Sequence, residues 1–175
     1  MDAALAQLEQ KGVLAGLNLR EVADAVGITP ANIYYYFGSR QGLLRAALAR
    51  ETHQLADPVK QAAELDFVGR RLLMFDAIGE HPALALTALL ALDGDPDYRP
   101  LPFLEETRTY YAGLVEAGEL PADLDVDAVH LLGLAVSIGV AIYAESAGRQ
   151  LGTSVDDIRS RTKAVFEQML AAVAP

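Results

Sequence analysis

The chain has 175 residues, 52% of them hydrophobic, which is enough for one or two small domains with a substantial core. Its 24 acidic residues outnumber 14 basic ones, and a net charge of −10 argues against a generic, uniformly basic nucleic-acid binder. The absence of cysteine excludes disulfides, thiolate metal ligands and cysteine nucleophiles. The longest uncharged run, residues 128–144, is short for a membrane span, and no signal peptide is apparent, so we expect a cytoplasmic protein without a membrane partner.

The N-terminal residues predict two short helices with clear end signals. Residues 2–10 form the first, by their apolar spacing. Asn18 is a good N-cap for the second helix, and Glu21 stands three positions later, as in a capping box. Gly27 follows at the position where a helix end favours a left-handed residue, so this helix is expected to end there.

A tight turn then leads into a third predicted helix. Thr29 can cap this helix, and Pro30 occupies its first position, where no amide hydrogen is needed. Ile33 and Phe37 are four positions apart and face inward, whereas the outward positions carry Asn32, Tyr35 and Tyr36. Two helices joined by a glycine-containing turn, the second with exposed polar and aromatic groups, are the pattern of a helix-turn-helix.

A long amphipathic helix follows, which Ser39 caps and which ends near Pro58. We place the domain boundary there, and so predict one domain at residues 1–57 and another at 58–175. Residues 1–56 carry five basic and five acidic side chains, so the whole net charge of −10 lies in the rest of the chain. A neutral N-terminal module can approach phosphate, and an acidic partner domain cannot.

Residues 3–50 resemble the DNA-binding domain of the TetR/AcrR family of transcriptional regulators. Both spacing and residue type agree at Ala3-Ala4-Leu5, Lys11-Gly12, Leu19-Arg20-Glu21-Val22-Ala23, Val26-Gly27-Ile28, Tyr34-Tyr35-Tyr36-Phe37, Ser39-Arg40 and Leu43-Leu44. The resemblance implies an all-α fold with an N-terminal helix-turn-helix domain and a C-terminal helical ligand-binding and dimerisation domain. It also implies a homodimeric repressor that a small molecule releases from double-stranded, palindromic operator DNA.

Six residues are expected to contact DNA. The hydroxyl of Thr29 and the free amides at its helix start suit a phosphate. In the resemblance, Tyr34 matches a tyrosine that contacts the phosphate backbone, and Arg40 matches a basic phosphate clamp. An asparagine can read adenine edges and a tyrosine ring can pack on a thymine methyl, so we expect the bases to be read by Asn32, Tyr35 and Tyr36.

The remainder of the chain predicts only helices, because no stretch of useful length alternates with period two. Residues 93–102 and 118–125 read as loops from their glycine, proline and aspartate content. The segment 83–92 is almost wholly apolar, so burial on most sides is expected. The predicted helices span residues 59–78, 83–92, 103–117, 126–151 and 155–173.

The resemblance places an effector between the helices of the second domain. Apolar and amphipathic side chains on those helices predict a mostly hydrophobic ligand with a few hydrogen-bonding groups, although such stripes are more often plain core. The candidate ligand-binding residues are Met74, Phe75, Ile78, Leu86, Leu90, Tyr110, Tyr111 and Leu114.

The helix at 126–151 is apolar on more than one face, so we expect one face to meet a second copy. Small residues recur every four positions on it and would let another helix approach closely, and the last helix adds an apolar stripe. Together these predict a four-helix dimer interface that includes Gly133, Ser137, Ala141, Val165, Phe166 and Met169.

The sequence supports neither catalysis nor a bound cofactor. The three histidines lie on separate elements with no metal-ligand spacing, and no nucleotide or hydrolase motif is present. Three alternatives to a repressor stay open: a helical sensor with weakened or lost DNA binding, suggested by the short first helix; an activator; and an all-α enzyme, which the missing catalytic groups disfavour.

Overall fold

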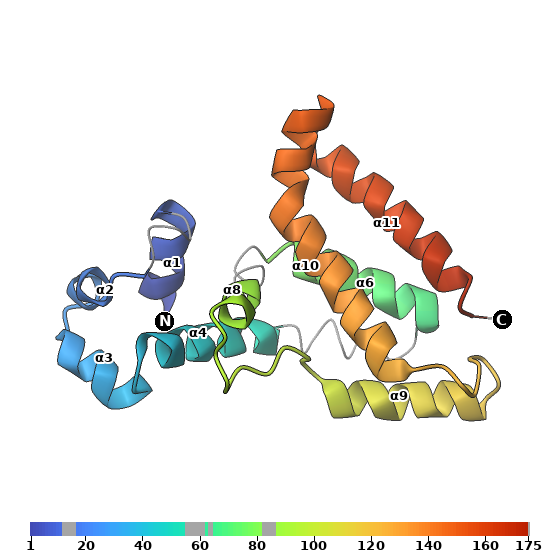
Figure 1. Ribbon diagram of the computed structural model, residues 1–175, viewed down its shortest axis with the longest axis horizontal. Coiled ribbons are helices and arrows are strands. Elements are labelled where there is room, and N and C mark those ends of the chain that lie inside the picture. Colours follow the sequence, from blue (N-terminus) through green and yellow to red (C-terminus); the bar gives the residue numbers. More distant parts are fainter. Residues whose placement is uncertain (12–16, 55–61, 63–64, 82–86, 175) are drawn as a thin grey trace. The chain divides into compact units, whose positions relative to one another are not determined.

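The computed structural model describes residues 1–11, 17–54, 62, 65–81 and 87–174, and these residues contain no β-strand. Figure 1 shows the helices in chain order, and the all-α prediction is confirmed. The helices are α1 (Asp2–Lys11), α2 (Leu19–Ala25), α3 (Pro30–Phe37), α4 (Arg40–Gln54), α6 (Phe67–Gly79), α8 (Thr87–Leu92), α9 (Leu104–Glu116), α10 (Val126–Leu151) and α11 (Val155–Ala171).

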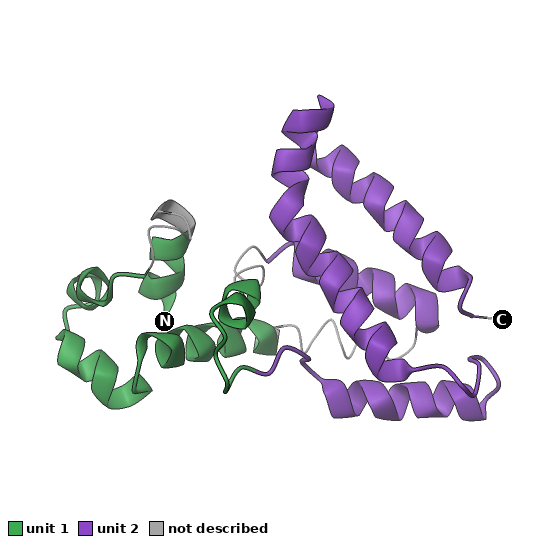
Figure 2. Cartoon of the chain, viewed as in Figure 1, with its two compact units in different colours: residues 1–54, 86–98 green, residues 55–85, 99–175 purple. Residues whose placement is uncertain are grey.

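The chain divides into two compact units, coloured separately in Figure 2. Unit 1 comprises Met1–Gln54 together with Leu86–Tyr98, and unit 2 comprises Leu55–Ala85 together with Arg99–Pro175. The boundary predicted at Pro58 lies outside the described residues. The units differ from the predicted domains at Leu86–Tyr98, because this segment packs with the N-terminal helices rather than with the C-terminal ones.

A side-chain network fixes the start of α2 against α1. The Asn18 side chain accepts hydrogen bonds from the backbone amides of Arg20 and Glu21, and its own amide donates to the Glu21 carboxylate over 3.1 Å. The backbone amide of Asn18 donates to the Gln7 side chain over 2.8 Å, and that side chain also donates to Glu21. The predicted cap is therefore present, with Gln7 as a further member.

The turn between α2 and α3 depends on glycine. Gly27 has a φ of 71°, a left-handed conformation that a side chain would strain. The amides of Gly27 and Ile28 donate back to Asp24 and Ala23, so the last carbonyls of α2 are satisfied. This turn redirects the chain into α3, where Ile33 is 2% exposed and anchors the helix in the core of unit 1.

Helix α4 starts very close to the end of α3. The hydroxyl of Ser39 accepts from the Gly42 amide at 2.9 Å and caps α4. A Cβ atom at Gly42 would lie 1.9 Å from the carbonyl oxygen of Phe37, so only glycine allows this approach. Beyond the turn, Leu43, Ala47 and Leu48 are buried and form the inward face of α4.

Ionic contacts tie α8 and its following loop to α4. Arg45 pairs with Asp95 at 2.5 Å and with Asp97 at 3.2 Å, and Gln41 donates to Asp93 at 3.0 Å. The Asp95 side chain is only 2% exposed, so these contacts lie partly inside unit 1. They account for the presence of residues 86–98 in this unit.

Two predicted helices differ from those in the structure. Part of the segment expected at 59–78, residues 59–61, 63 and 64, lies outside the described residues; α6 begins at Phe67, where the Asp66 side chain caps it by accepting from the Gly69 amide at 2.7 Å. The segment 83–92 is not buried on most sides in its described part, since Leu92 is 84% exposed. Only its inner face, with Thr87 and Leu90, is buried.

Unit 2 is built around α10, which packs against α6, α9 and α11 (Figure 1). The bounds of α10 agree with the prediction, and Asp125 caps its start while left-handed Gly152 ends it. Ser154 caps α11 in the same way. The main core cluster contains Phe67, Phe75, Tyr111, Leu120, Phe166 and Leu170.

We expect Gly42→Ala to lower the free energy of unfolding of unit 1 by about 1–3 kcal/mol, because the added methyl group must displace the Phe37 carbonyl. Gly113→Ala is the matched control, since a Cβ there meets nothing within 4 Å and the helix gains about 0.5–1 kcal/mol. Urea unfolding followed by circular dichroism measures both. If both substitutions stabilised the protein equally, Gly42 would not lie as close to the Phe37 carbonyl as described.

Candidate DNA-binding surface and ligand site

Helix α3 presents three aromatic rings to solvent. Tyr34, Tyr35 and Tyr36 are 54%, 82% and 73% exposed, and the last two rings meet edge to face at 5.0 Å. Solvated tyrosine rings in a row leave apolar surface in water, which is unfavourable unless something covers it. The geometry leaves all three free to contact another molecule.

The polar residues at the start of α3 are engaged with each other. The Oδ1 atom of Asn32 accepts from the Thr29 amide at 3.2 Å and from the Thr29 hydroxyl at 2.5 Å. The backbone amide of Asn32 in turn donates to the Thr29 hydroxyl at 3.4 Å. In this arrangement Thr29 has no free hydroxyl proton for a phosphate, and Asn32 keeps only its side-chain NH₂ group for a base.

The cations of unit 1 divide into paired and unpaired groups. Arg45 and Arg50 are engaged by carboxylates, with Asp95 and Asp97 beside the first and Asp2 and Glu51 beside the second. Arg20 and Arg40, in contrast, are exposed and form no ion pair with a described residue. Arg40 is the first residue of α4, three positions after the end of α3, so its charge is available next to α3.

The eight candidate ligand residues do not gather around one described cavity. Phe75 and Tyr111 belong to the main core of unit 2, with Tyr110 and Leu114 packed on it. Met74 and Ile78 lie in a smaller cluster with Phe103, Leu134 and Ile138. Leu86 lies outside the described residues, and Leu90 is a buried residue of unit 1.

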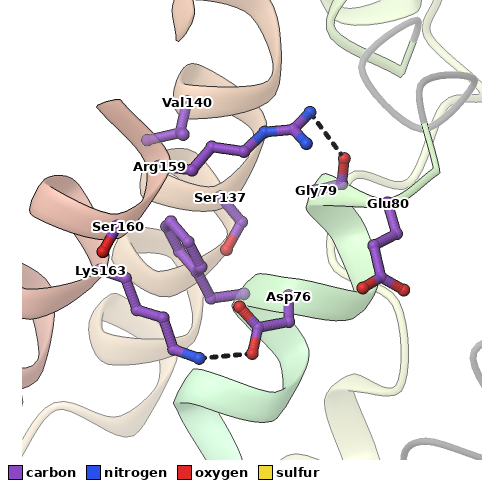
Figure 3. A pocket seen from close by; sticks show the side chains of 9 residues that line it. Asp76, Gly79, Glu80, Ser137, Val140, Arg159, Ser160 and Lys163 are labelled. Carbon is purple, nitrogen blue, oxygen red and sulfur yellow. Dashed lines mark hydrogen bonds and ion pairs between the residues drawn. The ribbon is translucent and has the colours of Figure 1, made fainter. Parts of the chain in front are cut away.

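A cavity of about 250 Å³ lies between α6, α10 and α11 (Figure 3). Phe75 is the one predicted ligand residue in its wall; the others are Asp76, Gly79, Glu80, Ser137, Val140, Arg159, Ser160 and Lys163. Figure 3 shows Lys163 bonded to Asp76, and Arg159 donating to the Gly79 carbonyl at the end of α6. Most of these lining residues have charged or hydroxyl side chains, and Phe75 and Val140 add apolar surface.

Sequence reasoning missed a buried polar cluster on α6, α9 and α10. Arg71 is 9% exposed and donates through Nε to the Tyr111 hydroxyl and through Nη1 to His130 Nδ1, at 3.3 Å in the second case. His130 Nε2 donates to the Pro102 carbonyl at 2.9 Å, next to Phe103, whose φ of 52° is left-handed. These bonds fit a neutral imidazole.

Burial governs the proton equilibria of this cluster. It lowers the pKa of His130, and the neighbouring Arg71 charge lowers it further. Burial likewise raises the pKa of the Tyr111 hydroxyl. The one hint in the sequence was a histidine inside the uncharged run at 128–144, while its partners lie far away in the chain.

The predicted dimer residues divide between the interior and the surface of unit 2. Gly133, Ser137 and Phe166 are buried inside the unit. Ala141 is half-buried, whereas Val165 and Met169 are 55% and 60% exposed. Outward-facing apolar side chains on α10 complete an exposed apolar face: Leu131, Leu132, Ile142 and Tyr143.

Among the described residues, α10 alone is long and apolar enough to cross a membrane. This is weak evidence, because a helix in a protein core or interface meets the same criteria. No cluster of described histidine, aspartate and glutamate side chains is arranged to hold a metal ion.

Comparison with known proteins finds a family model that matches the N-terminal residues and solved structures with a similar fold. Residues 1–47 match the family model described as bacterial regulatory proteins, tetR family. A protein from Rhodococcus sp. described as a TetR-family transcriptional regulator superposes with a TM-score of 0.70 at 21% identity, over 97% of this chain and 95% of its own. No curated protein matches the sequence.

Two further solved structures share the fold. One, described as the molecular basis for control of antibiotic production by bacterial hormones, has a TM-score of 0.64 at 18% identity and covers 98% of this chain and 94% of its own. A TetR-family regulator from Haemophilus influenzae has a TM-score of 0.52 at 19% identity, over 99% and 96% of the chains.

We expect the stability of unit 2 to fall as the pH drops below about 6.5, the usual histidine pKa. Since the pKa of His130 is lowered by folding, the unfolded chain takes up this proton first. The contribution is therefore fully present above the unfolded pKa and is lost as the pH falls toward the folded one. Asp127, Arg70 and Arg71 are the charges that act on the ring.

His130→Gln, which keeps a donor and an acceptor but does not titrate, should make the unfolding free energy less dependent on pH between about 7.5 and 5. His53→Gln, at an exposed position of unit 1, is the control and should keep the wild-type dependence. Urea titrations at each pH measure this. An unchanged slope in His130→Gln would contradict the buried, neutral state.

Proposed function

We propose that the chain belongs to the tetR family of bacterial regulatory proteins, whose model matches residues 1–47, and that it is a repressor released from palindromic operator DNA by a small molecule. It is a DNA-binding transcriptional regulator rather than an enzyme. The observation that carries the proposal is α3, where three exposed tyrosines stand beside the unpaired Arg40. A cytoplasmic location follows from this role.

We assign the six DNA-contacting residues to two tasks. Arg40 and the hydroxyl of Tyr34 hold phosphates, which fixes the register of α3 without reading sequence. Tyr35, Tyr36 and the free NH₂ group of Asn32 read base edges and thymine methyl groups. Thr29 supports these contacts as the cap that orients Asn32, and it binds phosphate only through the backbone amides at the helix start.

Two copies pair, in this proposal, through the exposed apolar face on α10 and α11. An apolar face of this kind is uncommon on a monomer and is typical of an interface between subunits. On α10, Leu132 and Tyr143 are eleven residues apart, or about three helical turns, and so lie on one side of the helix. Four helices from two copies would then exclude water from both faces.

The effector acts through its preference between two dimer states. A ligand releases operator only if it binds the DNA-incompetent state more tightly, and by linkage operator then weakens its binding. We place the effector in unit 2, near the α6 and α10 residues that include Phe75. The alternative of a sensor with weakened DNA binding is favoured by one observation, that only Arg20 and Arg40 are unpaired cations among the described side chains of unit 1.

Arg40→Ala should weaken binding of a palindromic duplex and flatten its salt dependence. Loss of one phosphate contact in each subunit lowers the slope of log K against log salt by about 2 per dimer. Arg149→Ala removes the same charge from unit 2, at a residue paired with Glu145, and is the control. Gel shifts over a salt series, with the DNA upstream of the protein's own gene, provide the measurement.

Tyr35→Ala should instead change which sequence is preferred, at about 1–3 kcal/mol per lost base contact. Selection from a random duplex library measures this preference. An Arg40→Ala variant with the wild-type salt slope would refute the phosphate role. Failure of the wild-type protein to bind any duplex at low salt would favour the sensor alternative.

Leu132→Asp should convert dimers to monomers, since it puts a charge into the centre of the proposed interface. Leu92→Asp is the matched control. Leu92 is also an exposed leucine, 84% exposed, but it lies on α8 in unit 1, away from the proposed interface. Sedimentation velocity at micromolar concentration distinguishes the two states. A wild-type protein that sediments as a monomer would rule out the proposed interface.

A further inference from the structure

The buried guanidinium of Arg71 lacks an anionic partner. Its side chain is 9% exposed, and no carboxylate of a described residue forms an ion pair with it. Burial of a charge without a counter-charge costs several kcal/mol, so such groups are normally paired. The half-buried arginines of unit 2 are less enclosed: Arg159 donates to the Gly79 carbonyl at the end of α6, and Arg70 lies over the Tyr110 ring.

Neutral groups hold this guanidinium in one orientation. Tyr111 accepts from Nε, and the guanidinium carbon lies 4.9 Å from the centre of the Tyr111 ring. His130 accepts from Nη1. A Cβ atom at position 133 would lie 3.4 Å from Nη1 and 3.6 Å from Cδ, which is ordinary van der Waals contact, so Gly133 of α10 lies directly beside the guanidinium.

The remaining edge of Arg71 is free to bind a ligand. Nη2 forms no hydrogen bond with a described residue, and the Tyr111 hydroxyl proton likewise has no acceptor there. Among the described residues, the fully buried side-chain atoms without a partner are Asp95 Oδ2 and Arg159 Nε, so Nη2 of Arg71 is not fully buried. Two adjacent donors therefore point to an acceptor that the chain itself does not supply.

We propose that Arg71 binds the carboxylate of a small organic acid, which is the effector in unit 2. The assignment as effector rests on the proposed function, whereas the binding site does not. A single positive charge balances a monoanion, while a phosphate dianion would leave excess negative charge in a low-dielectric site. The nearest other cation, Arg70, lies over the Tyr110 ring at 3.9 Å and is engaged there.

We place the body of the acid along α6 and α10, toward the cavity of Figure 3. Phe75 and Ser137 line the cavity of Figure 3, and each lies one helical turn beyond a residue of the Arg71 site. Those residues are Arg71 on α6 and Gly133 on α10, and one turn is about 5.4 Å. This ligand has an acidic head group, in contrast to the mainly hydrophobic effector that the sequence suggested.

Isothermal titration of the full chain with benzoate and hexanoate, each against its neutral amide, tests the site directly. We expect both acids to bind and to raise the unfolding temperature, whereas benzamide, hexanamide and inorganic phosphate should not. Arg71→Met should weaken the acids roughly tenfold or more, because a charge-assisted hydrogen bond is lost. Arg70→Met, which removes the neighbouring charge, is the control and should bind the acids nearly as well as wild type.

The stability of the ligand-free variants separates a binding role from a structural one. If Arg71 is kept for a ligand, Arg71→Met removes an uncompensated charge and leaves the unfolding temperature unchanged or raised. Tyr111→Phe, which keeps the ring and removes the hydroxyl, should weaken acid binding while the protein stays folded. Binding of amides as tightly as acids, no binding of either acid, or a large loss of stability in Arg71→Met with acid affinity retained would overturn the proposal.

Operator binding distinguishes failure of this site from failure of the proposed function. Release of operator by a neutral compound in both wild type and Arg71→Met would refute the acid effector and leave the repressor in place. Arg71-dependent binding of acids by a protein that binds no duplex would support the site and refute the repressor.

Discussion

Helix α10 has more apolar surface than its own unit can cover, and much of the molecule follows from this constraint. Its inner side carries His130, Gly133 and Ser137, which meet α6 and the arginine buried there. Its outer side carries leucine and tyrosine side chains that remain in water. Both sides belong to the same 26-residue helix, so the proposed ligand site on one side and the proposed pairing surface on the other are rigidly connected. A shift of α10 on α6 would therefore be felt at the outer face.

The local fold could be predicted from the sequence where end signals were strong. Asn18, Thr29 and Asp125 accept hydrogen bonds from the amides at the starts of their helices, and glycines end α2 and α10. Within the described part of the segment expected at 59–78, α6 begins at Phe67, because Asp66 provides a cap that apolar spacing alone does not reveal. Helical periodicity also could not say which of two apolar faces turns inward, and two residues predicted for the dimer interface, Gly133 and Phe166, are buried inside unit 2.

The site in unit 2 was harder to predict because its members are far apart in sequence. Tyr111 and His130 reach Arg71 from positions 40 and 59 residues away, and neither spacing carries a signature. The expected hydrophobic pocket reflected the composition of the helices, whereas the functional chemistry of such a pocket depends on a few polar groups. On α3, in contrast, exposure of the tyrosines followed directly from the burial of Ile33, since a short helix shows one face to its core.

The pairing of Arg45 with Asp95 has a consequence for how such proteins can exchange their parts during evolution. A recombination event that joined residues 1–54 to a foreign C-terminal region would carry away the arginine and leave its aspartate behind. The transferred segment would lack the packing of α8 on α4, and the Arg45 side chain would no longer have its carboxylate partner. Transfer of residues 1–54 to another protein should therefore succeed most often when the acidic loop at 93–97 is transferred as well, or when the receiving protein has an equivalent carboxylate.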